Sequence, residues 1–439
     1  MNKLSIRNRM LVGLTLFSMF FGAGNLIFPP SLGAMAGTKT PLAMLGFSIT
    51  GIGCPILGVI AVSRAGSLDE LAGRVHPTFA KVFTLLIYLS IGPCLAIPRT
   101  ASTSFEMAVT PFLSGDAPRG LIQLIYSVLF FAVALYFSLT PEKLTQLLGR
   151  FTSPCLLLLI GVVFIGCVLA PPAGYGEPIG VYAQSPVLQG FLGGYQTMDA
   201  IAALNFGLVI AMNINNRGVT ERSAVVKEIT YAGGIASLLF LAVYGAIAHV
   251  GAVAGGAYGE LADGTAALTA ITHDLFGNAG IVLLGLIFLL ACLNTCIGLI
   301  ACCSEYFSQI LPRFSQRQWA FFFAFISMVI SNVRLSTILS LSVPVLGMLY
   351  PPALVLILLS FWEGARERKL VYPLAIAFTG ITSVIVVLAT GGFMTIPGLT
   401  PFLMDSLPVV VRELLWVGPA LLGILLGWFL SPAPARKSV

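Results

Sequence analysis

The chain has 439 residues, of which 57% are hydrophobic and only 9% carry a charge. Soluble domains carry roughly a quarter charged residues, so this composition excludes an ordinary soluble protein. The formal charge of +6 follows from the uneven placement of Lys and Arg described below, and it requires no nucleic-acid partner.

Twelve apolar segments, separated by charged loops, predict a polytopic membrane protein of the all-α class. A spanning helix needs about 20 mainly apolar residues, and a membrane β-barrel would instead show alternating hydrophobicity. The loops are too short for a soluble domain, and we expect 251–276 to form a helix on the outer surface. The predicted spans are 9–36, 40–63, 77–105, 120–138, 144–170, 188–214, 228–250, 277–308, 318–333, 335–361, 371–392 and 412–430.

Positive charges lie mostly on one side of these spans. Eighteen Lys and Arg residues fall in one set of loops and termini, and the opposite set holds only Lys39, Arg119, Arg334 and Arg412. Cytoplasmic loops carry the excess of positive charge, so we expect both termini in the cytoplasm and an even number of spans. The basic start resembles a secretion signal, but the Pro29-Pro30 pair is atypical and we expect no cleavage.

Two predicted spans carry their own helix breakers. The first contains "GAGN" at 22–25, and the sixth contains "GFLGGYQTMDA" at 190–200, with an aspartate at membrane depth. Broken helices at corresponding positions of two halves indicate the binding site of a secondary transporter. Glycine is also common in membrane helices because it permits close packing, which accounts for one such span but not for two at matching positions.

The two broken spans each lead a set of five. Because five is odd, the second set is predicted to be inverted relative to the first. We therefore predict a single polytopic domain, 1–439, with repeat one at about 9–170, repeat two at about 188–361, and two extra helices, 11 and 12, at about 371–430.

The first break offers two kinds of polar group. Unwinding around Phe21–Asn25 frees amide N–H groups at the start of the following half-helix, where the helix dipole also favours a carboxylate. Carbonyl groups near Ser18 and Phe21, at the end of the preceding half-helix, suit a small cation. An amino-acid zwitterion transported together with sodium requires both.

The eighth span supplies a partner for the cation. In "LLACLNTCIG", residues 289–298, Ala291, Asn294 and Thr295 lie on one helix face. Their carbonyl, amide and hydroxyl oxygens are ligands that hard cations prefer. An ordinary cluster of hydrogen bonds between helices is the alternative interpretation.

Ionisable residues within the spans are functional candidates. For Asp199 we expect capping and positioning of the second half of span six, and the alternatives are that it attracts the substrate ammonium group or joins the ion site. For Arg99 and Glu106, which are two turns apart, we expect ion pairs with other segments, and for Glu305 a role at an inner gate or at the interface. No lysine lies in the core of a span, and Lys143 is at an end, which favours sodium over protons.

Several long motifs resemble the branched-chain amino acid carrier family, the LIVCS cation symporters of bacteria. These are "LFSMFFGAGNLIFPPSLG", "AIPRTASTSFE", "GFLGGYQTMDAIAALNFG", "ACLNTCIGLIACCSEYF" and "LSVPVLGMLYPPALVLILL". The resemblance covers nearly all the predicted spans. It implies uptake of leucine, isoleucine and valine driven by sodium, in the bacterial inner membrane. It also implies a LeuT-type fold with a five-plus-five inverted repeat.

The resemblance also implies roles for single residues. The substrate carboxylate would be held at Ala23 and Gly24, and a second sodium would contact Phe20 and Asn25. Asn294 stands where the wider fold carries a hydroxyl. The predicted substrate-binding residues are Phe21, Ala23, Gly24, Asn25, Gly194, Tyr195, Thr197, Met198 and Asp199. The predicted sodium ligands are Ser18, Phe21, Ala291, Asn294 and Thr295.

We therefore predict a sodium-coupled importer of branched-chain amino acids that works by alternating access, with sodium as coupling ion and no other cofactor. The alternative within transport is a proton-coupled carrier of other small neutral amino acids. A polytopic enzyme is disfavoured because Arg99, Glu106 and Asp199 are too sparse and too deep for a catalytic cluster. A channel is disfavoured because rings of charge and filter loops are absent from the sequence.

Overall fold

The computed structural model describes residues 3–114, 116–139, 147–333, 335–391 and 393–431. Within these ranges the chain forms helices and no strands. The predicted fifth span begins at residue 144, and the count of positive charges includes Lys143, Arg334, Arg436 and Lys437. These positions lie outside the described residues.

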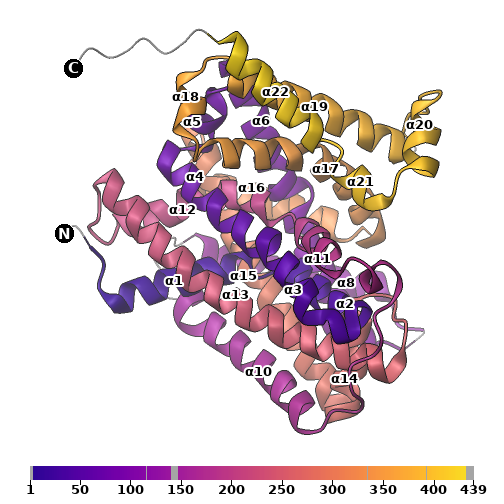
Figure 1. Cartoon of the computed structure of the whole chain (residues 1–439). Helices are drawn as coiled ribbons and strands as arrows, with labels where there is room; N and C mark the ends of the chain where they lie inside the picture. Colours follow the sequence, from indigo (N-terminus) through magenta and orange to yellow (C-terminus); the bar gives the residue numbers. More distant parts are fainter. Residues whose placement is uncertain (1–2, 115, 140–146, 334, 392, 432–439) are drawn as a thin grey trace.

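Divided at the bounds of the predicted repeats, which stay a prediction, the helices form three groups along the chain (Figure 1). The first group is α1 (Ile6–Phe20), α2 (Ala23–Ala36), α3 (Thr40–Ser48), α4 (Cys54–Ala65), α5 (Leu68–Gly73), α6 (Pro77–Leu89), α7 (Ala96–Ala108), α8 (Arg119–Ser138) and α10 (Ser153–Leu169). The second group is α11 (Pro186–Tyr195), α12 (Asp199–Asn215), α13 (Arg222–Tyr258), α14 (Gly264–Phe276), α15 (Asn278–Ile310), α16 (Gln316–Ser331) and α17 (Leu335–Leu359). The third group is α18 (Glu363–Glu367), α19 (Val371–Thr390), α20 (Leu399–Pro401), α21 (Val409–Glu413) and α22 (Val417–Leu430).

By length and composition, 8 helical segments in the described part of the chain can cross a membrane, and α11 with α12, bent by 48°, adds a ninth. One segment, Ala23–Ala65, has 43 residues, which exceeds a single crossing of about 20 residues. Gly37, with φ 49°, turns the chain inside it. The polytopic helical class is confirmed, and the number of twelve spans stays a prediction.

The core of the bundle is formed by helices that approach one another closely. Along α2 and α13 the backbones touch: a Cβ added to Gly33 would lie 2.0 Å from the Ala248 carbonyl oxygen, and one added to Gly251 would lie 2.1 Å from that of Pro30. Such approach through small residues is typical of membrane helices. In Figure 1, α19 and α22 lie together at the edge of the bundle, and α19 packs against α17.

The segment predicted as a surface helix, 251–276, is divided between two elements. Residues 251–258 continue α13, which corrects the expected start of the surface helix, because no breaker interrupts α13 before Gly259 (φ 74°). The rest of the segment forms α14, whose first residue Gly264 packs on the backbone of α2 at Ile27, and its position on the outer surface stays a prediction. Asp263 begins α14 as its N-cap by accepting hydrogen bonds from the amides of Thr265 and Ala266.

A third interruption, which the sequence analysis missed, lies in the predicted span 77–105. A π-helical turn at Ser90–Cys94 separates α6 from α7, and Gly92 within it is non-helical (φ −81°, ψ −127°). Pro93 follows directly and cannot donate a helical hydrogen bond. This turn sets the position of α7, which carries Arg99.

Candidate functional site

The first break lies between α1 and α2 at Phe21 and Gly22. Gly22 is extended (φ −116°, ψ −162°), and its amide donates to Asn25 Oδ1 at 2.9 Å. In a continuous helix that amide would donate to the carbonyl of Ser18, so the Ser18 carbonyl is released from its helical partner. At the other side of the break, the first amides of α2 lack intrahelical acceptors.

The second break joins α11 to α12 by a tight turn, and every amide group of this turn donates a backbone hydrogen bond. Gln196, Thr197 and Met198 donate to the carbonyls of Leu192, Gly194 and Tyr195, at 2.9, 3.3 and 3.2 Å. Met198 is left-handed (φ 58°), and no other non-glycine residue in the described ranges has positive φ.

Met198, and not Asp199, is the N-cap of α12, and it makes no side-chain capping bond. The expectation that Asp199 caps this half-helix is therefore wrong. The left-handed residue that ends the turn is Met198, one position earlier than expected, so Asp199 already has helical geometry in the first turn of α12. There it still lies at the positive end of the helix dipole.

Asn25 joins the two breaks. Its side-chain amide donates to Asp199 Oδ2 at 2.6 Å and to the hydroxyl of Tyr244 on α13. Its oxygen accepts from Gly22, so both its donors and its acceptor are engaged. The pairing crosses 174 positions of sequence, and it places the carboxylate of the second break directly beside the first.

The residues predicted on α15 lie against the first break. A Cβ added to Gly22 would be 2.9 Å from Thr295 Oγ1, and one added to Gly298 would be 3.1 Å from Met19 Cγ. Ser18 precedes Gly22 by one helical turn. Ala291 is fully buried on the same face of α15 as Asn294 and Thr295.

Several buried polar groups in this region have no hydrogen-bond partner in the described structure. They are Ser18 Oγ, both polar atoms of the Asn294 amide, and Thr295 Oγ1. Ser18 and Asn294 are both 0% exposed. Buried polar groups are almost always paired, so a concentration of unpaired oxygens at predicted cation ligands fits a bound cation.

Asn205 on α12 shares this property, since both polar atoms of its buried side chain are unpartnered. The sequence analysis did not select it. The available signal was a single amide in the apolar run "AALNFG", which is the kind of residue that is costly in a membrane unless it is paired.

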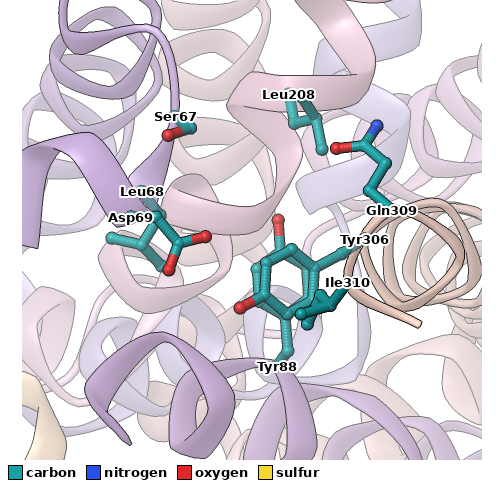
Figure 2. Close-up of a pocket in the computed structure, with 8 residues that line it drawn as sticks. All are labelled: Ser67, Leu68, Asp69, Tyr88, Leu208, Tyr306, Gln309 and Ile310. Atoms are coloured by element: carbon teal, nitrogen blue, oxygen red, sulfur yellow. The ribbon is translucent and has the colours of Figure 1, made fainter. Parts of the chain in front are cut away.

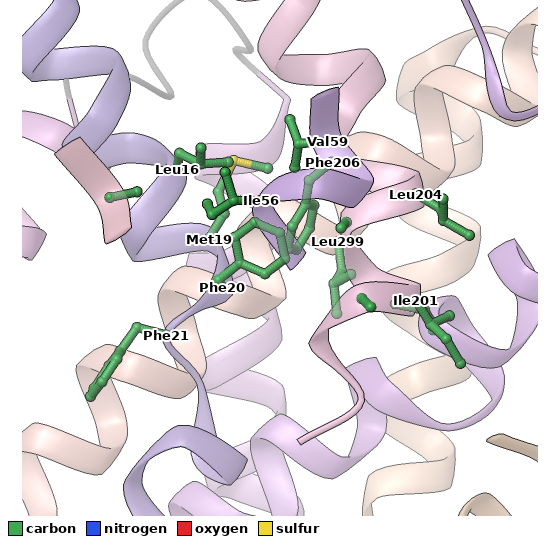
Figure 3. Close-up of a cluster of buried hydrophobic side chains, with 14 of the residues drawn as sticks. Leu16, Met19, Phe20, Phe21, Ile56, Val59, Ile201, Leu204, Phe206 and Leu299 are labelled. Atoms are coloured by element: carbon green, nitrogen blue, oxygen red, sulfur yellow. The ribbon is translucent and has the colours of Figure 1, made fainter. Parts of the chain in front are cut away.

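The aromatic residues around the breaks are packed together. Phe20 contacts Phe206 edge-on at 4.9 Å between ring centroids, and Phe21 stacks on Phe17 at 5.1 Å. Figure 3 shows Phe20 and Phe21 pointing in different directions from the end of α1. Tyr195 lies edge-on to Tyr350 at 4.5 Å. These pairs place packed aromatic side chains next to both breaks.

The ionisable residues of α7 do not act as a unit. Glu106 pairs with Arg119 at the start of α8, as expected for a partner on another segment. Arg99 makes no ion pair or hydrogen bond among the described residues, so the expected structural pair is absent there. Glu305 accepts from Gln309 at 3.0 Å and lines a small cavity with Asn213 and Gln316.

A larger cavity of about 270 Å³ lies between α5, α6, α12 and α15 (Figure 2). The rings of Tyr88 and Tyr306 stack in it at 3.8 Å. Burial raises the pKa of the Asp69 carboxyl above its usual value, while the nearby hydroxyls of Thr84 and Tyr306 act in the opposite direction. The cavity borders α12 and α15, the two helices that carry Asp199 and Thr295.

The chain is similar to known transport proteins over nearly all of its length. Residues 5–433 match the family model described as "Branched-chain amino acid transport protein". The chain is 37% identical to the branched-chain amino acid permease BraB of Bacillus subtilis, over 98% of this chain and 97% of that protein. It is 38% identical to the branched-chain amino acid transport system 2 carrier protein of Pseudomonas aeruginosa, over 94% of each chain.

Solved structures share the fold at low sequence identity. Mhp1, a nucleobase-cation-symport-1 family transporter with bromovinylhydantoin bound, aligns with a TM-score of 0.60 at 14% identity, over 95% of this chain and 91% of that one. MhsT in complex with L-phenylalanine aligns with a TM-score of 0.57 at 15% identity, over 88% and 98%. The expected LeuT-type fold of a multi-pass membrane protein is confirmed.

Proposed function

Because this chain belongs to the family of branched-chain amino acid transport proteins, we propose that it imports leucine, isoleucine and valine by sodium symport. Transport proceeds by alternating access across the bacterial inner membrane, with both termini in the cytoplasm. No covalent chemistry is involved, and sodium is the coupling ion.

The observation that carries sodium coupling is the group of unpartnered polar side chains beside the first break. Leaving a polar group buried without a partner costs roughly 2–7 kcal/mol. A sodium ion bound by Ser18, Asn294 and Thr295 offsets this cost, with carbonyls of Phe21 and Ala291 completing an oxygen shell. Neutral ligands suit a monovalent cation because they add no excess negative charge.

The substrate binds where the two breaks meet. Its carboxylate is held at the start of α2 by Ala23 and Gly24, and its ammonium group lies toward Asp199. Phe21, Tyr195 and Met198 line the apolar side, with Asn25, Gly194 and Thr197 shaping the polar side. A hydrophobic pocket separates substrates that differ by one methylene by only about 1–3 kcal/mol, so all three branched substrates are accepted.

Uptake of radiolabelled leucine into proteoliposomes tests this proposal. An inward sodium gradient and an inward proton gradient are imposed separately. Accumulation driven by sodium alone supports the proposal. Accumulation driven only by protons contradicts sodium coupling and favours a proton-coupled carrier, for which the buried carboxylate of Asp199 is the candidate proton carrier.

The Thr295→Ala variant tests the ion site itself. We expect the sodium concentration for half-maximal uptake to rise about tenfold, equivalent to about 1.4 kcal/mol, before leucine affinity at saturating sodium changes. Thr230→Ala is the matched control, because the Thr230 hydroxyl on α13 is satisfied by its own helix at Val226. An unchanged sodium response in both Thr295→Ala and Asn294→Ala removes α15 from the ion site.

A further inference from the structure

Arg99 projects toward the first break. A Cβ added to Gly24 would lie 3.4 Å from Arg99 Nη2, so the guanidinium lies against the first turn of α2. Cys292 on α15 lies beside both Arg99 and the backbone of Ala23. The interruption at Ser90–Cys94 precedes α7 and gives this helix a course separate from that of α6.

The Arg99 guanidinium has no binding partner within the described part of the protein. It donates no hydrogen bond and forms no ion pair within the described ranges, and its side chain is partly exposed although Pro98 and Thr100 on either side are buried. Two other charges on the helices do have ionic partners: Arg9 pairs with Glu228 at 2.6 Å, and Glu106 pairs with Arg119. Placing an ionisable residue at membrane depth costs free energy unless another group balances its charge.

Asp199 is the counterpart of Arg99. Arg99 lies against Gly24, and the next residue, Asn25, binds the Asp199 carboxylate. The two charges therefore face the same break, but they form no ion pair within the described residues. The meeting point of the breaks therefore presents a cation and an anion held apart from each other. An amino acid carries a carboxylate and an ammonium group on one carbon, and it matches this arrangement.

We propose that Arg99 binds the carboxylate of the transported amino acid, together with the first amides of α2. This inference rests on the proposed function, because it takes the substrate of that same site to be an amino acid. Arginine matches a carboxylate with two parallel N–H donors. A Cβ on Gly24 would already be in van der Waals contact with the guanidinium, so glycine at this position leaves the most room for a carboxylate beside Arg99.

Arg99 thereby sets a chemical limit on the substrates. Leucine is accepted, whereas leucinamide and leucinol, which keep the isobutyl group and the amine but lack the carboxylate, are rejected. A site that relied on apolar contacts and Asp199 alone would accept all three within a few-fold.

The test measures binding of leucine and leucinamide to the purified full-length protein in sodium-containing buffer. For the wild type we expect leucinamide to bind at least about 100-fold more weakly than leucine, the scale of losing one partner of a buried charge pair. Arg99→Gln should weaken leucine binding about 100-fold and change leucinamide binding by less than about threefold. Arg99→Lys, which keeps the charge but loses the planar fork, should fall between them.

The ratio of the two affinities separates a binding role from a structural one. General damage to the site weakens both ligands together, so an unchanged ratio in Arg99→Gln overturns the inference. Should that variant fail to fold, wild-type protein that binds leucinamide as tightly as leucine overturns it equally. Arg119→Gln, which removes an arginine paired with Glu106 at the end of α7, is the control and should preserve the wild-type ratio. Wild-type protein that binds no leucine at all overturns the proposed function itself.

Discussion

The two helix breaks are built from similar residues but leave different groups unused. At the second break, the three amides of the turn between α11 and α12 all donate within the turn, and the polar group that remains is the side chain of Asp199. At the first break, the Gly22 amide is diverted to Asn25, which releases backbone groups on both sides. In this protein the first break offers unsatisfied backbone groups to a ligand. The second break has no such backbone groups in its turn, and it serves to position the side chain of Asp199.

The glycines at the two breaks differ in the same way. A Cβ on Gly22 meets only the Thr295 side chain, at 2.9 Å, whereas a Cβ on Gly194 meets the Thr50 hydroxyl and, at 2.5 Å, the backbone carbonyl oxygen of Phe47 on α3. Glycine at the first break keeps space beside a predicted ion ligand. Glycine at the second break permits two helices to touch.

The connection between the breaks is the most vulnerable point of this arrangement. Asn25→Ala removes three hydrogen bonds and leaves the Gly22 amide, Asp199 and Tyr244 without this partner. Each unsatisfied buried group costs about 1–3 kcal/mol, and more for a charged one. We expect the initial rate of leucine uptake in proteoliposomes to fall by more than about 100-fold.

Asn332→Ala is the matched control for this substitution. Asn332 also donates from a partly buried amide, to Ser127 and to the Met328 carbonyl, but it is the C-cap of α16. Its uptake rate should stay within a few-fold of the wild type. Rapid uptake by Asn25→Ala would mean that the two breaks work independently.

A smaller effect is expected from Gly22→Ala. The added methyl group displaces the Thr295 side chain by a few tenths of an ångström or more, because 2.9 Å is closer than side-chain contacts allow. We expect the sodium concentration for half-maximal uptake to rise about tenfold, while the thermal unfolding temperature changes little. Gly234→Ala on α13, where an added Cβ meets nothing within 4 Å, controls for the substitution itself. A loss of thermal stability with unchanged sodium dependence would show that Gly22, like Gly194, serves packing.

The sequence was sufficient to locate both breaks and the partner helix, because their signals are local. "GAGN", "GFLGGYQTMDA" and the Ala291–Thr295 face are short patterns whose physical meaning does not depend on the rest of the fold. The predicted ligand roles of these residues stay predictions, although the unpartnered side chains of Ser18, Asn294 and Thr295 support them.

What the sequence did not reveal depends on distant pairing. The bond between Asn25 and Asp199, and the approach of Arg99 to Gly24, join segments that no local pattern relates. The interruption before α7 was overlooked for a different reason. Its Gly92-Pro93 signal is present in the sequence, but it lies inside a long apolar run whose overall hydropathy favoured one continuous span.

The smallest predicted effect comes from substituting Met198. It distinguishes what the backbone conformation contributes at the second break from what the Met198 side chain contributes. A left-handed conformation costs a non-glycine residue roughly 1–2 kcal/mol, and Met198 bears this cost. Met198→Gly removes it but adds the flexibility of glycine in the unfolded chain, roughly 0.5–1 kcal/mol. We therefore expect the unfolding temperature to stay the same or to rise by a few degrees, whereas Met198→Ile, with a β-branched side chain in the same conformation, should lower it.

The KM for leucine uptake then measures the contribution of the Met198 side chain to substrate binding. If Met198 lines the substrate pocket as predicted, Met198→Gly removes an apolar contact and the KM for leucine should rise about tenfold, in keeping with roughly 1.5 kcal/mol for a largely buried side chain. An unchanged KM with an unchanged unfolding temperature would mean that the second break contributes only the position of Asp199. A fall of several degrees in the unfolding temperature of Met198→Gly would mean that Met198 stabilises the turn by packing. The conformation of the second break would then depend on this side chain as well as on the backbone.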